Sequence, residues 1–392
     1  MSRSLLVVDD EPNILKAIER TFFETDYLIF TAPSADTALK VMAETSIDMV
    51  ISDMRMPSID GYQLLEMVRE RHPEIIRVIL SGHSDQENIV KTFSDGLAKD
   101  YLYKPWDNQE LISWVDHCFE IDTLTEFHRL NELLSPIYPA KIYSPWYQSY
   151  LKSRSSNGGT EELTEIINEN KLVAESLIHI CNVPTSITSV SSVNEAVTRL
   201  GTGAVSDIVM ALEVISSLLG VIDDNDRQHS TEILDHLIHI NSVFHDLYSD
   251  VKKVPVPSYY EALSLLHDIG QLAMVALFGA PYNEFMHMKH DNSQQMIFSE
   301  QARFGVTHSQ MGAYLAILWD LPLIVHEVCL FHHTPFAPSV IHQQEVLLIS
   351  LSDRLAHCIH TGDNIPNLQK ECSILGISEE CLNHHLRCSC EV

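Results

Sequence analysis

Two stretches decide the fold of the first part of the chain: LLVVDDEP over residues 5–12 and MVISDMRMPSIDG over residues 49–61. In each, a short apolar run ends on aspartate and is followed by turn-forming residues, which is the pattern of a buried strand. Apolar residues at helical spacing, such as Ile14, Ile18 and Phe22, lie between such runs. The predicted strands are Leu5–Val8, Tyr27–Thr31, Met49–Ser52, Ile76–Leu80 and Tyr101–Tyr103. Strands that alternate with helices predict an α/β fold with a doubly wound, five-strand parallel sheet.

Carboxylates gather where two of these strands end. Asp9 and Asp10 follow the first strand, and Asp53 ends the third. Ligands of such sheets bind at the carboxyl ends of the strands, so these side chains should share one shallow pocket. Without a counter-ion they would repel one another, and a hard divalent cation such as Mg²⁺ is the usual solution in proteins. The sequence therefore predicts a Mg²⁺ site at this edge.

Two further residues at strand ends suit phosphoryl chemistry. Ser81 follows the fourth strand and offers a hydroxyl, while Lys104 follows the fifth and offers a positive charge. Phosphoryl transfer needs positioning and charge neutralisation more than acid–base chemistry, and this set supplies both. The alternative is a solvated sheet edge at which the acidic residues only cap helices.

The motifs VVDDEP, ISDMRMPSIDG, LSGHSD and YLYKPW resemble those of two-component response-regulator receiver domains, over residues 3–120. The resemblance implies a phosphorylated aspartate, a bound Mg²⁺ and a cis Lys104–Pro105 bond. The implied phospho-acceptor is Asp53, the implied Mg²⁺ ligands are Asp9, Asp10, Asp53 and the backbone carbonyl of Arg55, and the implied phosphoryl contacts and switch residues are Ser81, Lys104 and Tyr101.

The remainder of the chain has helical periodicity and almost no alternation typical of strands, which predicts an all-α region. We expect a receiver domain over residues 1–120, a helical linker over 121–134, an all-helical output domain over 135–360 and a C-terminal tail over 361–392. The linker continues an apolar pattern from Leu111 to Leu134. Such a helix could pair with a second copy, so a homodimer is one option.

Histidines are numerous, 21 in all, and several accompany aspartates in helical segments. The candidate metal ligands in this part are His236, His267, Asp268, His308, His332, His333 and Asp353. Imidazoles and carboxylates from separate helices can hold a transition metal such as iron or manganese in the core of a bundle. Buried polar groups of this kind can also be satisfied by hydrogen bonds alone.

The order His, His-Asp, His, His, Asp resembles the HD phosphohydrolase superfamily. The segments ICNVPTSITSVSSVNEAVTRLG and THSQMGAYLAILWDLPLIVHEVCLFHH resemble the HDOD (HD-related output) family, over roughly residues 130–357. This chain departs from active hydrolases in two places: Gln271 stands where they commonly have lysine, and TPFAP follows His333 in place of a Gly-Tyr-Pro loop. The HDOD resemblance implies a regulatory module without catalytic activity.

The net charge and the cysteine content limit the kinds of partner and the cellular compartment that the sequence predicts. With 25 Lys and Arg against 54 Asp and Glu, the net charge of −29 argues against DNA binding, because phosphate backbones are repelled. No apolar run reaches the ~18 residues of a membrane span, and two carboxylates come too early for a signal peptide. Scattered cysteines fit a reducing cytoplasm. The tail residues Cys381, His384, His385, Cys388 and Cys390 lack the spacing of a structural zinc site, and we expect incidental thiols.

These observations predict a cytoplasmic response regulator without a membrane anchor. A sensor histidine kinase would phosphorylate Asp53 and thereby switch an HDOD output module, which would regulate a protein or nucleotide partner by binding. A cyclic-di-GMP enzyme is one candidate partner. The alternative is a receiver-gated, metal-dependent HD phosphohydrolase that cleaves a cyclic dinucleotide or another phosphoester.

Overall fold

The computed structural model describes residues 3–72, 75–81, 92, 97–124, 127–134, 144–155, 159–183, 189–288, 292–319, 321–361 and 368–377. The chain packs as two compact units that divide between Asp122 and Thr123, and the second holds most of the later residues. Each unit is described by itself.

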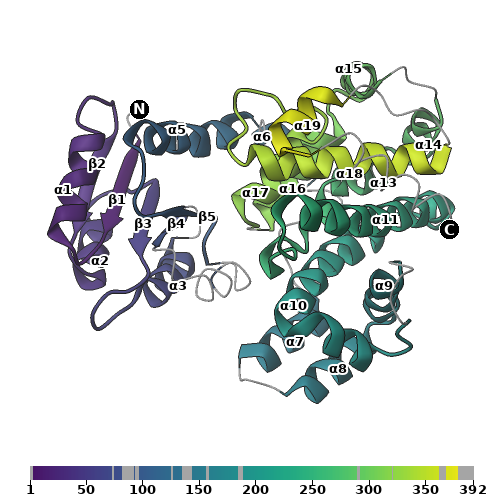
Figure 1. The fold of residues 1–392 in the computed structure, drawn as a ribbon, viewed down its shortest axis with the longest axis horizontal. Helices are drawn as coiled ribbons and strands as arrows, with labels where there is room; N and C mark the ends of the chain where they lie inside the picture. Colours follow the sequence, from purple (N-terminus) through teal and green to yellow (C-terminus); the bar gives the residue numbers. More distant parts are fainter. Residues whose placement is uncertain are drawn as a thin grey trace. The chain divides into compact units, whose positions relative to one another are not determined.

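The first unit is a doubly wound α/β domain (Figure 1). Its elements are β1 (Ser4–Val8), α1 (Pro12–Thr21), β2 (Leu28–Ala32), α2 (Ala35–Glu44), β3 (Met49–Asp53), α3 (Gly61–Arg71), β4 (Ile76–Ser81), β5 (Asp100–Tyr103) and α5 (Asn108–Leu124). All strand pairs are parallel, in the order β2-β1-β3-β4-β5. The predicted fold class and all five predicted strands are confirmed, with ends that differ by at most one residue.

The register of the sheet brings the predicted site residues to one edge. Val8 at the end of β1 lies opposite Ser52, and Asp53 at the end of β3 lies opposite Leu80. The strands β1 and β3 are buried along their whole length, and Leu6, Val8 and Val50 belong to a core that includes residues of α2 and α3. Because both central strands are anchored in this way, Asp9 and Asp53 leave the core at neighbouring points.

The predicted continuous helix from Leu111 to Leu134 is described as two helices. The first, α5, ends at Leu124, and α6 (Phe127–Leu134) follows, while residues 125 and 126 lie outside the described part. The buried residues of α6 include Leu130 and Leu134. This segment is therefore helical in its described residues, as expected.

The regular elements described in the second unit are all helices, which confirms the all-α prediction (Figure 1). Its α-helices after α6 are α7 (Pro145–Ser155), α8 (Thr160–Glu169), α9 (Lys171–Asn182), α10 (Val193–Leu219), α11 (Arg227–Lys252), α12 (Leu263–Leu266), α13 (Ile269–Phe278), α14 (Ala280–Met286), α15 (Ser293–Phe304), α16 (His308–Leu318), α17 (Leu323–Phe331), α18 (Gln343–Thr361) and α19 (Gln369–Leu375). Short 3₁₀ turns cover Asp224–Asp226 and Ser258–Tyr260.

Helix α10 is long and apolar enough to cross a membrane by length and composition. However, 67% of its most apolar window is buried inside the helical unit, as in the core helix of a folded domain. It also contains a kink at Gly201, whose φ of 80° is in the left-handed region that favours glycine.

Part of the predicted tail is ordered on the helical unit. Helix α19 packs against α18, buries Cys372 and Leu375, and joins it through an ion pair of 2.7 Å between Arg354 and Glu371. The residues considered for zinc, from Cys381 to Cys390, lie outside the described part.

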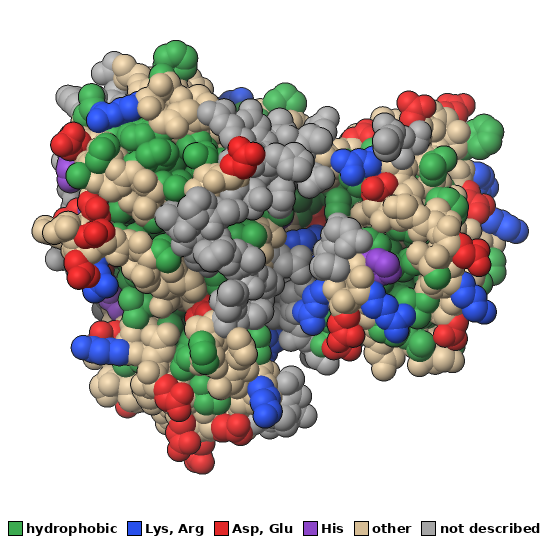
Figure 2. All heavy atoms as spheres, turned by 180° about the vertical axis from the view of Figure 1, so that it is seen from behind, with side chains coloured by type: hydrophobic (Ala, Val, Ile, Leu, Met, Phe, Trp, Pro, Cys, Tyr) green, Lys and Arg blue, Asp and Glu red, His purple; other side chains and the backbone are tan. Residues whose placement is uncertain are grey.

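The surface carries charges of both signs. Figure 2 shows acidic side chains scattered over the face in view, with lysines and arginines singly or in small groups among them. Among the side chains of this face that the structure describes, lysines and arginines form no continuous stripe of the kind that tracks a nucleic-acid backbone.

Candidate phosphorylation pocket and candidate metal centre

Two aspartates and a lysine meet at the carboxyl edge of the sheet. The Nζ atom of Lys104 donates to Oδ2 of Asp9 at 2.6 Å and to Oδ1 of Asp53 at 2.5 Å. Asp9 is fully buried and Asp53 is 8% exposed, whereas Asp10 is exposed. The pocket therefore places one ammonium between two carboxylates.

Burial raises the pKa of Asp53, although the hydrogen bond and charge of Lys104 act in the opposite direction. For Lys104, burial alone would lower the pKa, but its hydrogen bonds to Asp53 and Asp9 raise it overall. Lys104 therefore stays protonated, while the charge on Asp53 remains under-compensated. A divalent cation would relieve that imbalance.

Backbone groups hold both carboxylates in place. The N–H of Arg55 donates to Oδ2 of Asp53 at 2.7 Å, and the N–H of Glu11 donates to Oδ1 of Asp9 at 2.9 Å. The Lys104–Pro105 bond is cis, as the resemblance predicted. Ser81 is fully buried at the end of β4, where its carbonyl accepts from the backbone N–H of Lys104 at 2.8 Å.

The structure thus brings Asp9, Asp53, Ser81 and Lys104 to one edge. Tyr101, on β5, is partly buried against the core of the first unit. Residues 82–91 and 93–96, which contain most of the predicted LSGHSD motif, lie outside the described part.

Gly61 is a supporting residue that the motif reading did not single out. A Cβ atom at this position would lie 2.1 Å from the carbonyl oxygen of Asp53 and 2.9 Å from Cα of Met54. The chain can therefore return to β3 only because residue 61 has no side chain.

We expect Gly61→Ala to destabilise the receiver by about 1–3 kcal/mol, as overpacking does, because the added methyl must push away the backbone that carries Asp53. Thermal unfolding measures the change, and the rate of phosphoryl uptake should fall with it. Gly159→Ala adds the same methyl where nothing lies within 4 Å. Equal unfolding temperatures for the two variants would contradict this expectation.

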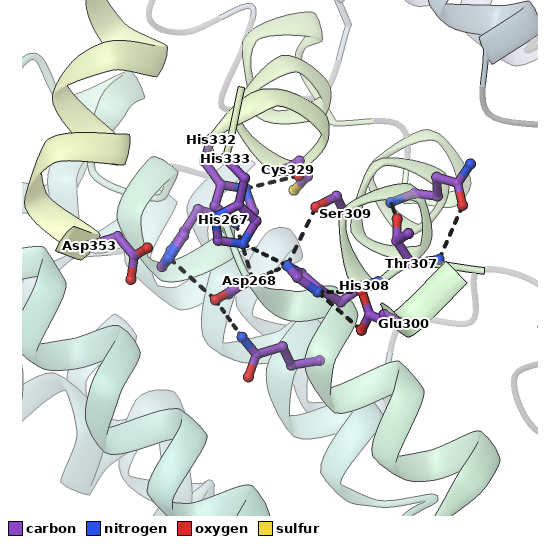
Figure 3. A network of polar contacts seen from close by, with 12 residues as sticks. His267, Asp268, Glu300, Thr307, His308, Ser309, Cys329, His332, His333 and Asp353 are labelled. Atoms are coloured by element: carbon purple, nitrogen blue, oxygen red, sulfur yellow. Dashed lines mark hydrogen bonds and ion pairs between the residues drawn. The ribbon is translucent and has the colours of Figure 1, made fainter. Parts of the chain in front are cut away.

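In the helical unit, the predicted His and Asp residues come from separate helices, and those labelled in Figure 3 lie close together. Asp268 precedes α13, and its carboxylate does not cap that helix. His308 begins α16, whose start is fixed by a capping box between Thr307 and Gln310. His267 follows α12, His332 and His333 follow α17, and His236 and Asp353 lie on α11 and α18.

Asp268 lies at the centre of the cluster. Its Oδ1 atom is 3.3 Å from Nε2 of His308 and 3.4 Å from Nε2 of His332. Nε2 of His308 is in turn 3.0 Å from Nε2 of His333. One ligand atom from each of Asp268, His308, His332 and His333 lies within 4.8 Å of all the others, and we call these residues the four-residue set.

The histidines are oriented by what their Nδ1 atoms contact. Nδ1 of His267 faces the carbonyl of Ser264 at 2.7 Å, and Nδ1 of His332 faces that of Val328 at 3.0 Å. These carbonyls can only accept, so each Nδ1 carries the proton and each Nε2 presents a lone pair. Nε2 of His267, Nε2 of His332 and Oδ1 of Asp268 are buried without a hydrogen-bond partner in the described part of the chain. Such orphaned atoms, all acceptors, fit a cation.

The pKa values of Asp268 and His333 also fit metal binding. Burial opposes the charge of Asp268, but the adjacent His308 and His267 hold its pKa well below the usual range. Burial, with His332 and His308 beside it, lowers the pKa of His333 well below the usual range. A charged carboxylate and a neutral imidazole are the forms that bind metal.

A second group adjoins the first. Nε2 of His236 is 3.3 Å from Oδ1 of Asp353, and both residues offer atoms within 4.8 Å of Asp268. Burial would lower the pKa of His236, but the hydrogen bond that its ring donates to Asp353 and the charge of that carboxylate raise it above its usual value.

Sequence reasoning missed Glu300 on α15. Its fully buried carboxylate contacts Nδ1 of His308 at 2.9 and 3.1 Å and accepts from the hydroxyl of Tyr282 at 2.8 Å. Burial would lower the pKa of His308, but Glu300 and Asp268 raise it to about 9. Nothing in the local pattern of α15 marks this residue, because its partners come from other helices.

Comparisons with known proteins agree with this division. Residues 5–116 match the response regulator receiver domain family, and residues 150–335 match the HDOD domain family. The chain is 36% identical over 129 residues to the hydrogenase transcriptional regulatory protein HoxA of Cupriavidus necator, which is 33% of this chain and 27% of that protein. It is 34% identical over 117 residues to the DNA-binding transcriptional regulator NtrC of Salmonella typhimurium, 30% of this chain and 25% of that protein. This chain thus spans about a quarter of the length of these curated relatives.

Among solved structures, the signal receiver domain of an HD domain-containing protein from Pseudomonas fluorescens Pf-5 is 32% identical, with a TM-score of 0.30. The match covers 31% of this chain and 96% of that one.

The acidic pocket on a doubly wound sheet agrees with the receiver match, and the receiver and HDOD matches together place this chain in the class of two-component signalling proteins. The two family matches make the assignment specific. This chain is a response regulator in which a receiver domain is followed by an HDOD output domain. The matched domains do not indicate DNA binding.

Proposed function

We propose that Asp53 accepts a phosphoryl group from the phosphohistidine of a sensor kinase, with Mg²⁺ bound by Asp9, Asp10 and Asp53 and by the carbonyl of Arg55. An oxygen of Asp53 bonds to phosphorus as the bond from phosphorus to the histidine nitrogen breaks, and the electron pair of that bond returns to the imidazole. The observation that carries this proposal is the buried Asp9–Lys104–Asp53 contact at the carboxyl edge of the sheet. Lys104 already lies where negative charge would increase.

Phosphorylation then acts as a switch within the receiver. The new phosphoryl oxygens form an ion pair with Lys104 and accept a hydrogen bond from the hydroxyl of Ser81 at the end of β4. Tyr101 on the neighbouring strand β5 responds to that change and alters the surface beside it. This is a local charge event that biases a two-state element.

We expect Asp53→Asn to abolish phosphoryl uptake, because an amide oxygen is too weak a nucleophile for the transfer. The full chain is incubated with radiolabelled acetyl phosphate and Mg²⁺, and the protein-bound label is counted. Asp36→Asn, which changes an exposed aspartate on α2, is the matched control and should be labelled normally. Label that persists in Asp53→Asn would refute Asp53 as the acceptor.

The output domain is proposed to act by binding. A regulatory role is supported by the HDOD match and by Gln271 in place of lysine. A bound metal is supported by the buried cluster, which suits a transition metal. Its ligands would come from His236, His267, Asp268, His308, His332, His333 and Asp353. Iron or manganese bound there would fix the helices that carry these residues and so shape a surface for a protein or nucleotide partner. The cytoplasm is the compartment in which such a relay would operate.

The alternative of a receiver-gated phosphohydrolase uses the same residues, and a bound metal would polarise a phosphoester there. No comparison favours it. Hydrolysis of bis(p-nitrophenyl) phosphate by the metal-loaded chain, lost in Asp268→Ala, would support it over the binding role.

A further inference from the structure

We infer that the HDOD domain holds one metal ion per chain, bound by the four-residue set, and that Gln271 prevents a second ion from binding at the same carboxylate. This inference rests on the metal-binding part of the proposed function. It deepens that part by assigning the ion to one side of the His–Asp cluster.

The two oxygens of Asp268 have different surroundings. Oδ1 has no hydrogen-bond partner in the described part of the chain and faces the imidazoles of His308 and His332. Oδ2 accepts from the side-chain amide of Gln271 at 2.6 Å and lies 3.6 Å from Nε2 of His267. A carboxylate that bridges two ions commonly gives one oxygen to each. The amide hydrogen at Oδ2 carries partial positive charge and therefore opposes a second cation there.

The other side of the cluster needs no ion. His236 and Asp353 pair with each other at 3.3 Å, and their side chains are 34% and 15% exposed. By contrast, the side chains of Asp268, His308 and His332 are at most 3% exposed. Orphaned buried acceptors cost free energy, whereas a partly hydrated ion pair does not. Two of the three orphaned acceptors, Nε2 of His332 and Oδ1 of Asp268, belong to the four-residue set, and the third, Nε2 of His267, adjoins it at 3.6 Å from Oδ2 of Asp268.

Hydrogen bonds to residues outside the four-residue set orient its histidine rings so that they can bind a cation. His332 is oriented by backbone carbonyls and His308 by Glu300, which Tyr282 secures in turn. Ligating histidines in proteins characteristically use the second ring nitrogen in this way. Gln271 does not belong to the set. It acts through Asp268, because its side-chain amide donates to Oδ2 and so occupies the oxygen that a second ion would need.

The donor chemistry selects the class of metal. Three imidazoles and one carboxylate suit Fe²⁺, Co²⁺ or Zn²⁺, whereas Mg²⁺ prefers oxygen ligands. The two candidate sites of the chain therefore take different ions. A single ion also lacks the clamp that a pair of metals provides in hydrolysis, which agrees with a regulatory role.

The test measures metal stoichiometry in the full chain. Protein stripped with a chelator is loaded with Co²⁺ in excess Mg²⁺, which occupies the carboxylates of the receiver, and is then desalted. Cobalt is counted by mass spectrometry, and its visible absorption reports nitrogen ligands. We expect one Co²⁺ per chain.

Two matched variants locate the ion. His332→Gln should weaken Co²⁺ binding at least 10-fold, whereas His236→Gln should retain one equivalent. Two equivalents in the unchanged protein, one of them lost in His236→Gln, would overturn the single-ion site but leave metal binding intact. No retained cobalt would overturn metal binding itself, and phosphoryl uptake by Asp53 would be unaffected by either result.

Gln271→Ala tests the restriction directly. Removal of the amide should let a second Co²⁺ bind between Asp268, His236 and Asp353, so the stoichiometry should rise towards two. Circular dichroism checks that the variant is folded. A folded variant that still binds one ion would overturn the role given to Gln271.

Discussion

Gly270→Ala is expected to destabilise the helical domain by about 3 kcal/mol or more, at the upper end of the cost of overpacking. A Cβ atom at residue 270 would lie 1.8 Å from the carbonyl oxygen of His308 and 2.7 Å from the backbone nitrogen of Gly312. Both are backbone atoms, so no side-chain rotation can relieve the clash. Helices α13 and α16, which are in extensive contact, would have to separate.

The same displacement should reach the His–Asp cluster. Asp268 immediately precedes α13 and His308 begins α16, so separation of these helices moves two members of the four-residue set apart. Gly270→Ala should therefore lose Co²⁺ affinity as well as stability. The close approach of the helices, more than any single contact, sets the distances within the cluster.

The measurement is chemical unfolding followed by circular dichroism and by the fluorescence of Trp319, a buried residue of the helical unit. Because two domains unfold, the transition of the helical domain is fitted separately. Gly220→Ala is the control, since its Cβ would lie 3.4 Å from the nearest atoms, which is an ordinary contact. If Gly270→Ala unfolds at the same denaturant concentration as Gly220→Ala, the close helix crossing is wrong.

The receiver could be predicted well because its signals are local. A strand that ends on aspartate is recognisable from a few residues, and parallel pairing then brings Asp9 and Asp53 together without further information. The contribution of Gly61 could not be predicted, because it depends on how closely the chain returns to the carbonyl of Asp53. That distance is a property of the folded loop.

The site of the helical domain could be predicted less completely, because its residues come from distant parts of the sequence. The residues from His236 to Asp353 were selected by order and residue type, and the structure brings them together. The full burial of Asp268, His308 and His332 and the partial exposure of His236 and Asp353 did not follow from the sequence, because helical periodicity does not specify which faces meet. The contacts of Glu300 and Gln271 were out of reach for the same reason.

Glu300→Ala is the second substitution with a large expected effect. Glu300 is fully buried, and its removal leaves Nδ1 and the backbone N–H of His308 and the hydroxyl of Tyr282 without their acceptor. Loss of one partner of a buried ion pair typically costs about 3–5 kcal/mol. Glu300 and Asp268 raise the pKa of His308 to about 9, so the loss of Glu300 would remove one of the carboxylates that stabilise its charged form and leave Asp268 at 3.3 Å.

Metal binding should respond in parallel. Without Glu300 the ring of His308 is no longer held with Nε2 towards Asp268, and loss of such a support commonly weakens metal affinity about 10–100-fold. Titration with Co²⁺ measures the affinity, and unfolding with and without Co²⁺ measures the stability.

Two milder variants separate charge from hydrogen bonding. Glu300→Gln keeps an oxygen that can accept from Nδ1 of His308, so it should restore most of the Co²⁺ affinity but less of the stability of the metal-free chain. Tyr282→Phe removes only the hydroxyl that secures Glu300 and should fall between Glu300→Gln and the unchanged protein. Co²⁺ affinity that is unchanged in Glu300→Ala would show that His308 is oriented without Glu300, because a positioning residue must act on the affinity of the site it supports.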